Sequence, residues 1–360
     1  MDIQLKDIVK NVPVGMDLQP SFLIHSGMDL YFVINIREPI TNGVRGESSY
    51  ICSYDLKKHA ITWIVELTEK GKFNSILNTP VIINNFLYVV HSNVVFAIDR
   101  CNGDVVWSKK LKLKYFLGVI LSNVEQRLFL NNSGELIELD PFTGKVKQSK
   151  KPRVRWFDSQ VIPHRGKLYV SASNSKILEL DPDNLNVLGE FKFAGGWAVG
   201  ATPLFHNDSL VCASYGGSIN IFDLESKVAT KKFKKKAGRE ANQLLVNDYY
   251  IVFESLENDA LTCFDVSKKK RCWKLELTGI KSVWKKDNDS IFVIHERNLN
   301  YVVDLLNIHT GKLLTTIETS PKVSEANYKF GLWDGSGGLC SESGELFLNY
   351  KPDVISIHSI

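Results

Sequence analysis

An internal repeat is the feature that most restricts how this chain of 360 residues can fold. Each copy reads as a strand, a short turn, a second strand that ends in an anchor residue, another turn and a third strand. Successive anchors are separated by 44, 41, 41, 42, 42 and 42 positions. The anchors are Asp55, Asp99, Asp140, Asp181, Asp223, Asp265 and Asn307. Two unrelated domains would not produce such regular spacing, so one architecture should cover almost the whole chain.

A repeat of this length with four short strands is typical of a β-propeller blade. We therefore predict an all-β fold, a single eight-bladed β-propeller domain of four-stranded antiparallel blades over residues 1–360. The C-terminal copy lacks its outer strand, so the N-terminal strand is expected to complete the last blade and close the ring. The predicted blades cover residues 20–67, 76–112, 117–150, 158–193, 200–234, 241–277, 281–318, and 328–360 together with 1–8.

Tryptophan recurs eight residues after the anchor in three copies, as Trp63, Trp107 and Trp273. A shared offset indicates a shared position in the blade, so these rings are expected to be largely buried and structural.

The best copy is DRCNGDVVW at residues 99–107, where Asp, Gly and Trp follow an LYV-type strand. This pattern resembles the pyrroloquinoline-quinone-type (PQQ-like) repeat β-propeller family, and the copies at 55–63 and 265–273 keep the Asp and the Trp but lack the Gly. The resemblance covers nearly the whole chain and implies that the Trp docks between adjacent blades. It is specific for the fold and says little about function.

Members of that family that bind the quinone use an acidic calcium ligand set and a vicinal disulfide. This sequence has no adjacent cysteines, so no cofactor is expected. Short members without a cofactor are similar to outer-membrane assembly lipoproteins, which carry a lipobox that this sequence lacks. A stand-alone member of this size also resembles an antidote or an adaptor.

The composition indicates a globular chain, with 44% apolar and 23% charged residues and a net charge of +4. The first residues, MDIQLKDIVKNV, carry acids where a signal peptide would be basic and then apolar. A cytoplasmic protein without a membrane span is therefore expected, and a mature chain whose leader has been removed is the alternative.

The six cysteines show no metal-binding or redox spacing, so reduced thiols that fill strand positions are expected. Cys263 and Cys272 could face each other across one hairpin, but in a reducing compartment they should stay unbridged. The eight histidines form no metal motif, and no catalytic cluster emerges. We therefore expect no enzyme; a lyase or hydrolase site in the channel, assembled from distant blades, is the alternative.

The connections that leave the outer strand of each blade should reach one face around the channel mouth. Sixteen residues past the anchor, four successive blades carry an aromatic or basic residue, and Lys and Arg outnumber acids in the same connections. The predicted partner-binding residues are Lys114, Tyr115, Phe116, Arg153, Arg155, Trp156, Phe157, Trp197 and Arg239.

Trp, Tyr and Arg are the residues that dominate binding energies at interfaces, and a basic rim steers acidic partners. The sequence therefore predicts a monomeric, non-enzymatic protein-binding platform for a protein with an acidic surface, acting as an inhibitor, an antidote (immunity protein) or an adaptor. Two alternatives stay open: the aromatics pack between blades, or the face binds a nucleic acid or another polyanion.

Overall fold

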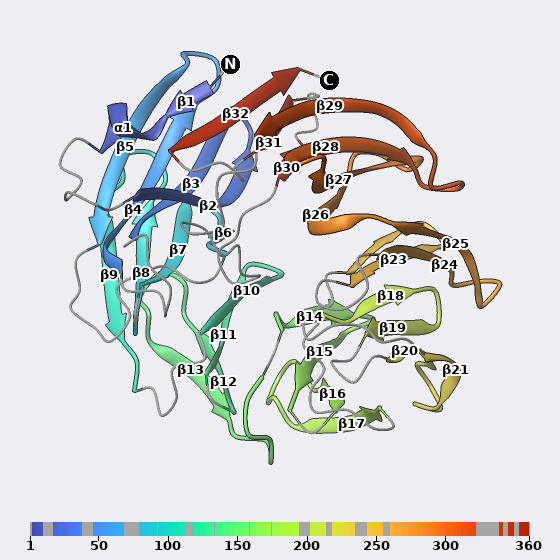
Figure 1. Cartoon of the computed structure of the whole chain (residues 1–360). Helices are drawn as coiled ribbons and strands as arrows, with labels where there is room; N and C mark the ends of the chain where they lie inside the picture. The colour runs from blue at the N-terminus through green and yellow to red at the C-terminus, as the bar shows by residue number, and fades with distance from the viewer. Residues whose placement is uncertain are drawn as a thin grey trace. The chain divides into compact units, whose positions relative to one another are not determined.

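The computed structural model shows an all-β, eight-bladed propeller whose blades are four-stranded antiparallel sheets (Figure 1). This confirms the predicted fold class. The structure describes residues 2–9, 17–37, 46–67, 79–91, 93–112, 119–132, 134–157, 159–173, 175–193, 202–213, 218–234, 243–254, 260–321, 338–340, 345–348 and 353–359.

Two compact units make up the chain. The first contains Met1–Leu130, Leu139–Val146 and Val323–Ile360, and the second contains Asn131–Glu138 and Lys147–Lys322. Blades 1, 2 and 8 belong to the first unit and blades 4 to 7 to the second, while residues of blade 3 are assigned to both.

Blades 1 to 4 each use four strands that are consecutive in the chain. Their strands are β2 (Asp17–Ser26), β3 (Asp29–Arg37), β4 (Gly46–Asp55) and β5 (Ala60–Leu67); β6 (Val81–Ile83), β7 (Phe86–His91), β8 (Val94–Asp99) and β9 (Val105–Lys110); β10 (Ile120–Val124), β11 (Arg127–Asn132), β12 (Glu135–Leu139) and β13 (Val146–Lys150); and β14 (Ile162–His164), β15 (Lys167–Ala172), β16 (Lys176–Leu180) and β17 (Val187–Lys192).

Blades 5 to 7 repeat this order, and blade 8 combines the two ends of the chain. Their strands are β18 (Leu204–His206), β19 (Ser209–Ala213), β20 (Ser218–Asp223) and β21 (Ala229–Lys234); β22 (Gln243–Val246), β23 (Tyr249–Glu254), β24 (Ala260–Asp265) and β25 (Lys270–Glu276); β26 (Thr278–Lys285), β27 (Ser290–Arg297), β28 (Asn300–Asn307) and β29 (Leu313–Pro321); and β30 (Gly338–Cys340), β31 (Glu345–Leu348), β32 (Val354–Ser359) and β1 (Asp2–Gln4).

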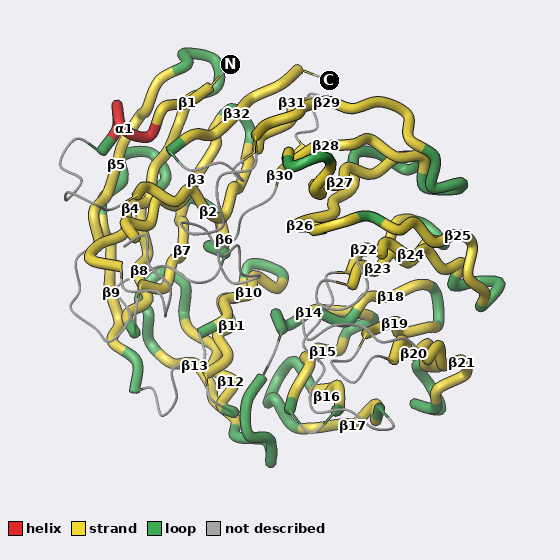
Figure 2. Tube along the Cα trace, in the orientation of Figure 1, coloured by secondary structure: helices red, strands yellow, loops and turns green. Residues whose placement is uncertain are grey.

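The N-terminal strand completes the C-terminal blade, as predicted. Strand β1 pairs antiparallel with β32, with Ile3 opposite Ile355 (Figure 1). Of the predicted residues 1–8, Asp2–Gln4 form strand β1, and the chain then turns into the short helix α1 (Leu5–Ile8). That helix is the only one in the described part of the chain, which is otherwise strand and turn (Figure 2). No helix among these residues is long and apolar enough to cross a membrane.

Burial differs between the strands of a blade. The middle strands β7 and β8 are almost entirely buried, and successive residues, which point to opposite faces of the sheet, are buried alike. Both faces of these strands are therefore covered. The fourth strand, β9, is largely exposed. Strand β9 carries a β-bulge at Val106 in its pairing with β8, and a bulge recurs in the fourth strands of blades 1, 4, 5, 6 and 7. Such bulges discourage pairing with other chains.

The anchor residues shape the turn between the third and fourth strands. In blade 3, Oδ1 of Asp140 accepts hydrogen bonds from the backbone N–H groups of Phe142 (3.0 Å) and Thr143 (2.9 Å). The turn then closes with Gly144 at φ +66°, a left-handed conformation that suits glycine. Equivalent side-chain caps are made by Asp55, Asp99, Asp181, Asp223, Asp265 and Asn307.

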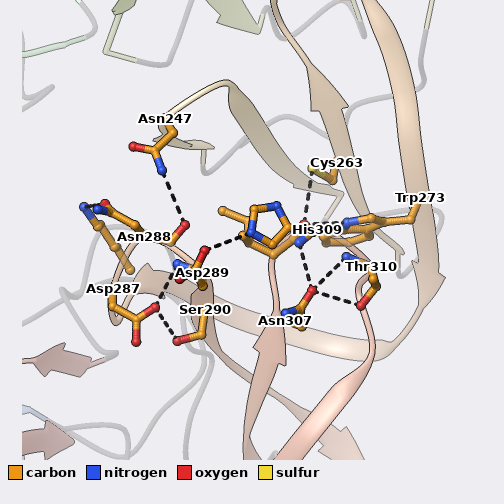
Figure 3. Close-up of polar contacts among 12 residues, drawn as sticks. Asn247, Cys263, Trp273, Asp287, Asn288, Asp289, Ser290, Asn307, His309 and Thr310 are labelled. Atoms are coloured by element: carbon orange, nitrogen blue, oxygen red, sulfur yellow. Dashed lines mark hydrogen bonds and ion pairs between the residues drawn. The ribbon is translucent and has the colours of Figure 1, made fainter.

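Each repeat tryptophan docks on the anchor turn of the following blade. Trp63 is 7% exposed, and its Nε1 donates to the backbone oxygen of Arg100 at 2.8 Å. The ring lies so close to Gly103 that a Cβ there would be 3.0 Å from it. The same arrangement joins Trp107 to Pro141 and Gly144, and Trp273 to Ile308 and Gly311 (Figure 3). The prediction that these rings dock between adjacent blades is confirmed. Trp63 is buried as expected, whereas Trp107 and Trp273 are half-buried.

Candidate protein-binding site

The connection between blades 3 and 4 carries four of the predicted partner-binding residues. It runs from the end of β13 to Phe157, which forms an isolated β-bridge with Ala172 at the end of β15. Ser173 fixes the middle of the connection, because its Oγ accepts the N–H groups of Arg155 (2.9 Å) and Trp156 (3.3 Å). Its own N–H donates to the backbone oxygen of Trp156 at 3.0 Å. The backbone of the segment is therefore fixed by Ser173, without hydrogen bonds that use the side chains of Arg155 and Trp156.

Gly134 explains why this connection can lie so close to blade 3. Gly134 follows β11 in the turn before β12 and has φ +82°. A Cβ at this position would be 2.6 Å from the backbone oxygen of Val154 and 3.1 Å from that of Arg155. Any residue with a side chain would push the connection away or strain the turn.

We expect Gly134→Ala to lower the free energy of unfolding by more than the about 1 to 3 kcal/mol that a sparsely populated backbone conformation costs a non-glycine residue, because the added Cβ also meets the backbone of Val154. Urea unfolding would measure this. Gly166→Ala is the matched control, because Gly166 also has a positive φ but nothing lies within 4 Å of its added Cβ. Equal losses in the two variants would mean that backbone conformation alone, and not the close approach of Val154, makes Gly134 necessary.

The exposed surface of the connection combines cations with one aromatic ring. Arg153 and Arg155 are exposed, and Trp156 is half-buried. The guanidinium carbon of Arg155 lies 4.8 Å from the centroid of the Trp156 ring, within the range of a cation–π interaction. Lys151 forms an exposed ion pair with Glu135 at 3.4 Å. The arginines therefore supply positive charge next to an apolar ring on a fixed backbone.

Phe157 has a different role from its neighbours. Its side chain is 7% exposed, so it packs beneath the connection and presents little surface to a partner. The remaining predicted residues lie outside the described part of the chain: they are Lys114, Tyr115, Phe116, Trp197 and Arg239. The described structure thus brings together Arg153, Arg155 and Trp156.

At the opposite ends of the strands from this connection, ionisable side chains cap the turns between the third and fourth strands of the blades. A backbone hydrogen bond from Lys58 holds the pKa of Asp55 below its usual value, and one from Ser226 does the same for the pKa of Asp223. In blade 7, Nε2 of His309 lies 2.9 Å from the carboxylate of Asp289 (Figure 3). Among the described residues, no group of three or more His, Cys, Asp and Glu side chains is placed to hold a metal ion.

Blade 7 also contains a buried polar network that sequence analysis missed. Asp304, 4% exposed, accepts hydrogen bonds from Nη2 of Arg297 (2.7 and 2.6 Å) and Oγ1 of Thr316 (2.7 Å), and Nε2 of His295 lies 2.9 Å away. Burial alone would raise the pKa of Asp304, but the hydrogen bonds from His295, Thr316 and Arg297 outweigh it and lower the pKa. The residues come from three strands and form no recognisable motif, so no signal in the sequence could have found them.

Exposed aromatic surface was missed at the junction of blades 2 and 3. Phe142 is 57% exposed and contacts the edge of Phe86, with ring centroids 6.0 Å apart. The sequence signal that could have revealed this exposed ring is the position of Phe142 in a turn, because turns usually lie at the surface.

Comparison with known proteins supports the family resemblance. A PQQ-type family model described as "Outer membrane protein assembly factor BamB" matches residues 47–275 of the chain. The structure is similar to that of BamB from Moraxella catarrhalis, with a TM-score of 0.65 and 14% identity, covering 94% of this chain and 100% of that one. No curated protein sequence matches the chain.

Two further solved structures share the architecture. The computationally designed Ika8 protein has a TM-score of 0.66 and 10% identity, covering 96% of this chain and 98% of that one. A chain of the mitotic checkpoint complex has a TM-score of 0.58 and 10% identity, covering 79% of this chain and 87% of that one. At these identities the structural likeness shows the fold alone, and that fold is consistent with a protein-binding scaffold.

Proposed function

The chain belongs to the family of the outer membrane protein assembly factor BamB, and from that premise we propose that it is a non-enzymatic protein-binding platform. Its partner is a protein with an acidic surface, which docks on the connection between blades 3 and 4. The observation that carries this proposal is the Arg155–Trp156 pair, a guanidinium 4.8 Å above an indole ring on a backbone that Ser173 holds in place.

Preorganisation makes this pair suitable for binding. A side chain that is already ordered loses little conformational entropy when a partner arrives, so more of the contact energy appears as affinity. The Arg155 guanidinium, oriented by the ring, presents its N–H groups as a planar fork that matches a carboxylate. Trp156 offers apolar area beside it, and tryptophan and arginine are the residues most enriched among binding hot spots.

The exposed charges favour an acidic partner. Lys150, Lys151, Arg153 and Arg155 follow one another closely along the chain, and all four are exposed. A cluster of one sign attracts a surface of the opposite sign and raises the association rate more than the final affinity. In this proposal the protein is a cytoplasmic monomer that acts as an inhibitor, an antidote or an adaptor, and it carries out no chemistry itself.

We expect Trp156→Ala to weaken partner binding by about 2 kcal/mol or more while the protein stays folded, as truncation of a hot-spot residue does. The partner would first be captured from a lysate of the native organism on the immobilised protein. Binding of the purified partner to the wild type and the variant would then be compared by surface plasmon resonance. Unchanged affinity, with unchanged thermal stability, would place the binding site on another face.

Charge reversal at the same site separates electrostatic steering from contact. Arg155→Glu should mainly slow association, and added salt should reduce that effect. Lys312→Glu is the matched control, because Lys312 is exposed in the turn between β28 and β29, at the opposite strand ends. If both reversals slow association equally, the net charge of the protein steers the partner, and the connection does not. A steep linear fall of log affinity with log salt concentration would instead indicate a polyanion.

A further inference from the structure

Two of the six cysteines lie at the same β-bulge in blade 6. On the paired strands β24 and β25, Cys263 is opposite Trp273 and Phe264 is opposite Arg271. Cys272 lies between these two pairs as the extra residue of the bulge, so it faces the Cys263 position. The thiols are near enough to affect each other: burial and then the neighbouring Cys272 raise the pKa of Cys263. Both are free thiols in the structure.

The two thiols differ in their access to solvent. Cys263 is fully buried, and its sulfur lies 4.0 Å from the backbone oxygen of Ile308 (Figure 3). Cys272 is exposed, and the exposed cations Lys270, Arg271 and Lys274 are its neighbours on β25. Exposed cysteines with cations nearby are those that react with disulfides. An oxidant can therefore reach the Cys272 thiol directly, whereas the Cys263 thiol beside it is shielded from solvent.

We propose that Cys263 and Cys272 are a redox-sensitive pair that closes into a disulfide across the bulge in the presence of a small-molecule disulfide such as oxidised glutathione. The Cys272 thiolate attacks one sulfur of that disulfide, forms a mixed disulfide and releases one glutathione thiolate. The Cys263 sulfur then attacks the Cys272 sulfur and releases the second glutathione, which leaves with the proton of the Cys263 thiol. The protein loses two protons and two electrons, and the oxidant is reduced to two thiols. The second step is intramolecular, which compensates for the low reactivity of a buried thiol.

The consequence of closure concerns the docking of blade 6 on blade 7. Trp273 follows Cys272 directly, and its Nε1 donates to the oxygen of Ile308 at 2.7 Å. A bond between the strands at the bulge would hold β25 against β24 at the residue that carries this contact. We expect the backbone amides of Trp273 and Lys274 to exchange with solvent more slowly after oxidation, because local opening of the outer strand then requires the cross-linked bulge to move.

The sequence between the two cysteines makes the bond easy to detect. Lys268, Lys269, Lys270 and Arg271 all lie between Cys263 and Cys272, so trypsin separates the two unless a disulfide joins them. The full-length protein would be incubated with oxidised glutathione, its free thiols blocked with an alkylating agent, and the digest analysed by mass spectrometry. We expect a linked pair of peptides containing Cys263 and Cys272, which disappears on reduction.

Two controls distinguish this bridge from modification of any exposed thiol. Cys101 is also exposed, and its sulfur donates a hydrogen bond to an amide oxygen of Asn85 at 3.6 Å. Because an amide cannot resolve a mixed disulfide as a thiol does, Cys101 should accumulate glutathione in the same sample. In Cys263→Ser, Cys272 should likewise accumulate glutathione, because the resolving thiol is gone. The proposal is overturned if wild-type Cys272 carries glutathione to the same extent as Cys101, or if it remains a free thiol while Cys101 reacts.

Discussion

Trp63→Ala is expected to lower the free energy of unfolding by about 3 to 5 kcal/mol, the range for emptying a large buried aromatic site. Trp63 is 7% exposed, packs 5.9 Å from the Tyr31 ring and donates to the oxygen of Arg100. Removal of the indole would leave that carbonyl without this donor and open a gap above Gly103. Urea unfolding of the wild type and the variant would measure the loss.

Two further variants make this prediction specific to docking. Trp63→Phe keeps much of the apolar volume but loses the donor, so its loss of stability should be smaller than that of the alanine variant. Thr315 occupies the same offset from its anchor in blade 7 and is exposed, so Thr315→Ala should change stability by less than about 0.5 kcal/mol. A loss at Trp63 as small as that at Thr315 would mean that the ring does not hold the blades together.

The number and order of the blades could be predicted because each repeat is a local pattern. The anchor, the turn and the following strand are close in the sequence. Asp140, for example, caps the backbone N–H groups of residues only two and three positions further along the chain. The prediction that the first residues complete the last blade rested on a missing outer strand, and β1 occupies that place. Helix α1 was not predicted, because the turn into it has no strong signal in the sequence.

The sequence could not show which tryptophan belongs to which glycine. The repeat pattern groups Trp107 with Gly103 in one copy, but Gly103 accommodates Trp63 of the preceding blade. The apparent loss of glycine in the copy at 265–273 has the same cause: the preceding blade has Lys231 at the tryptophan offset, so the turn of blade 6 needs no glycine and carries Lys269. A contact between blades is not visible within a single repeat.

The middle strands of a blade do not show the alternation of apolar and polar residues that is typical of a strand with one solvent-exposed face. Strand β8, VVFAID, is an almost continuous apolar run, because a strand covered on both faces has no polar side. Burial alternates instead along the outer strand β5, AITWIVEL.

For the candidate site, the offset from the anchor identified Trp156 and the excess of cations identified Arg155, but neither signal could separate these residues from Phe157. The three residues are consecutive, and their exposure depends on the bridge between Phe157 and Ala172, which is a tertiary contact. The network around Asp304 was missed for a related reason. His295 pairs with Val302 and Asp304 pairs with Val293, so the His and the Asp are diagonal neighbours whose contact depends on the register of β27 and β28.

Asp304→Ala is expected to lower the free energy of unfolding by about 3 to 5 kcal/mol, because removing one partner of a buried ionic network leaves the other groups uncompensated. Asp289→Ala is the matched control in the same blade: Asp289 also pairs with a histidine at 2.9 Å, but its side chain is 78% exposed. Its loss should be below about 1 kcal/mol, as is usual for exposed pairs. Equal effects of the two substitutions would contradict a structural role for the buried network.

The pH dependence of stability tests the same network independently. The pKa of Asp304 is lowered in the folded state, so its carboxylate binds a proton less readily there than in the unfolded chain. Its contribution to stability is therefore complete above the unfolded pKa of about 4 and is lost as the pH falls through the lower, folded value. Asp304→Asn cannot titrate, so the stability difference between the wild type and this variant should shrink as the pH is lowered below about 4. Urea unfolding at a series of pH values would show this convergence; a difference that stays constant would mean that the asparagine variant is destabilised by altered packing, and that the charge of Asp304 contributes nothing.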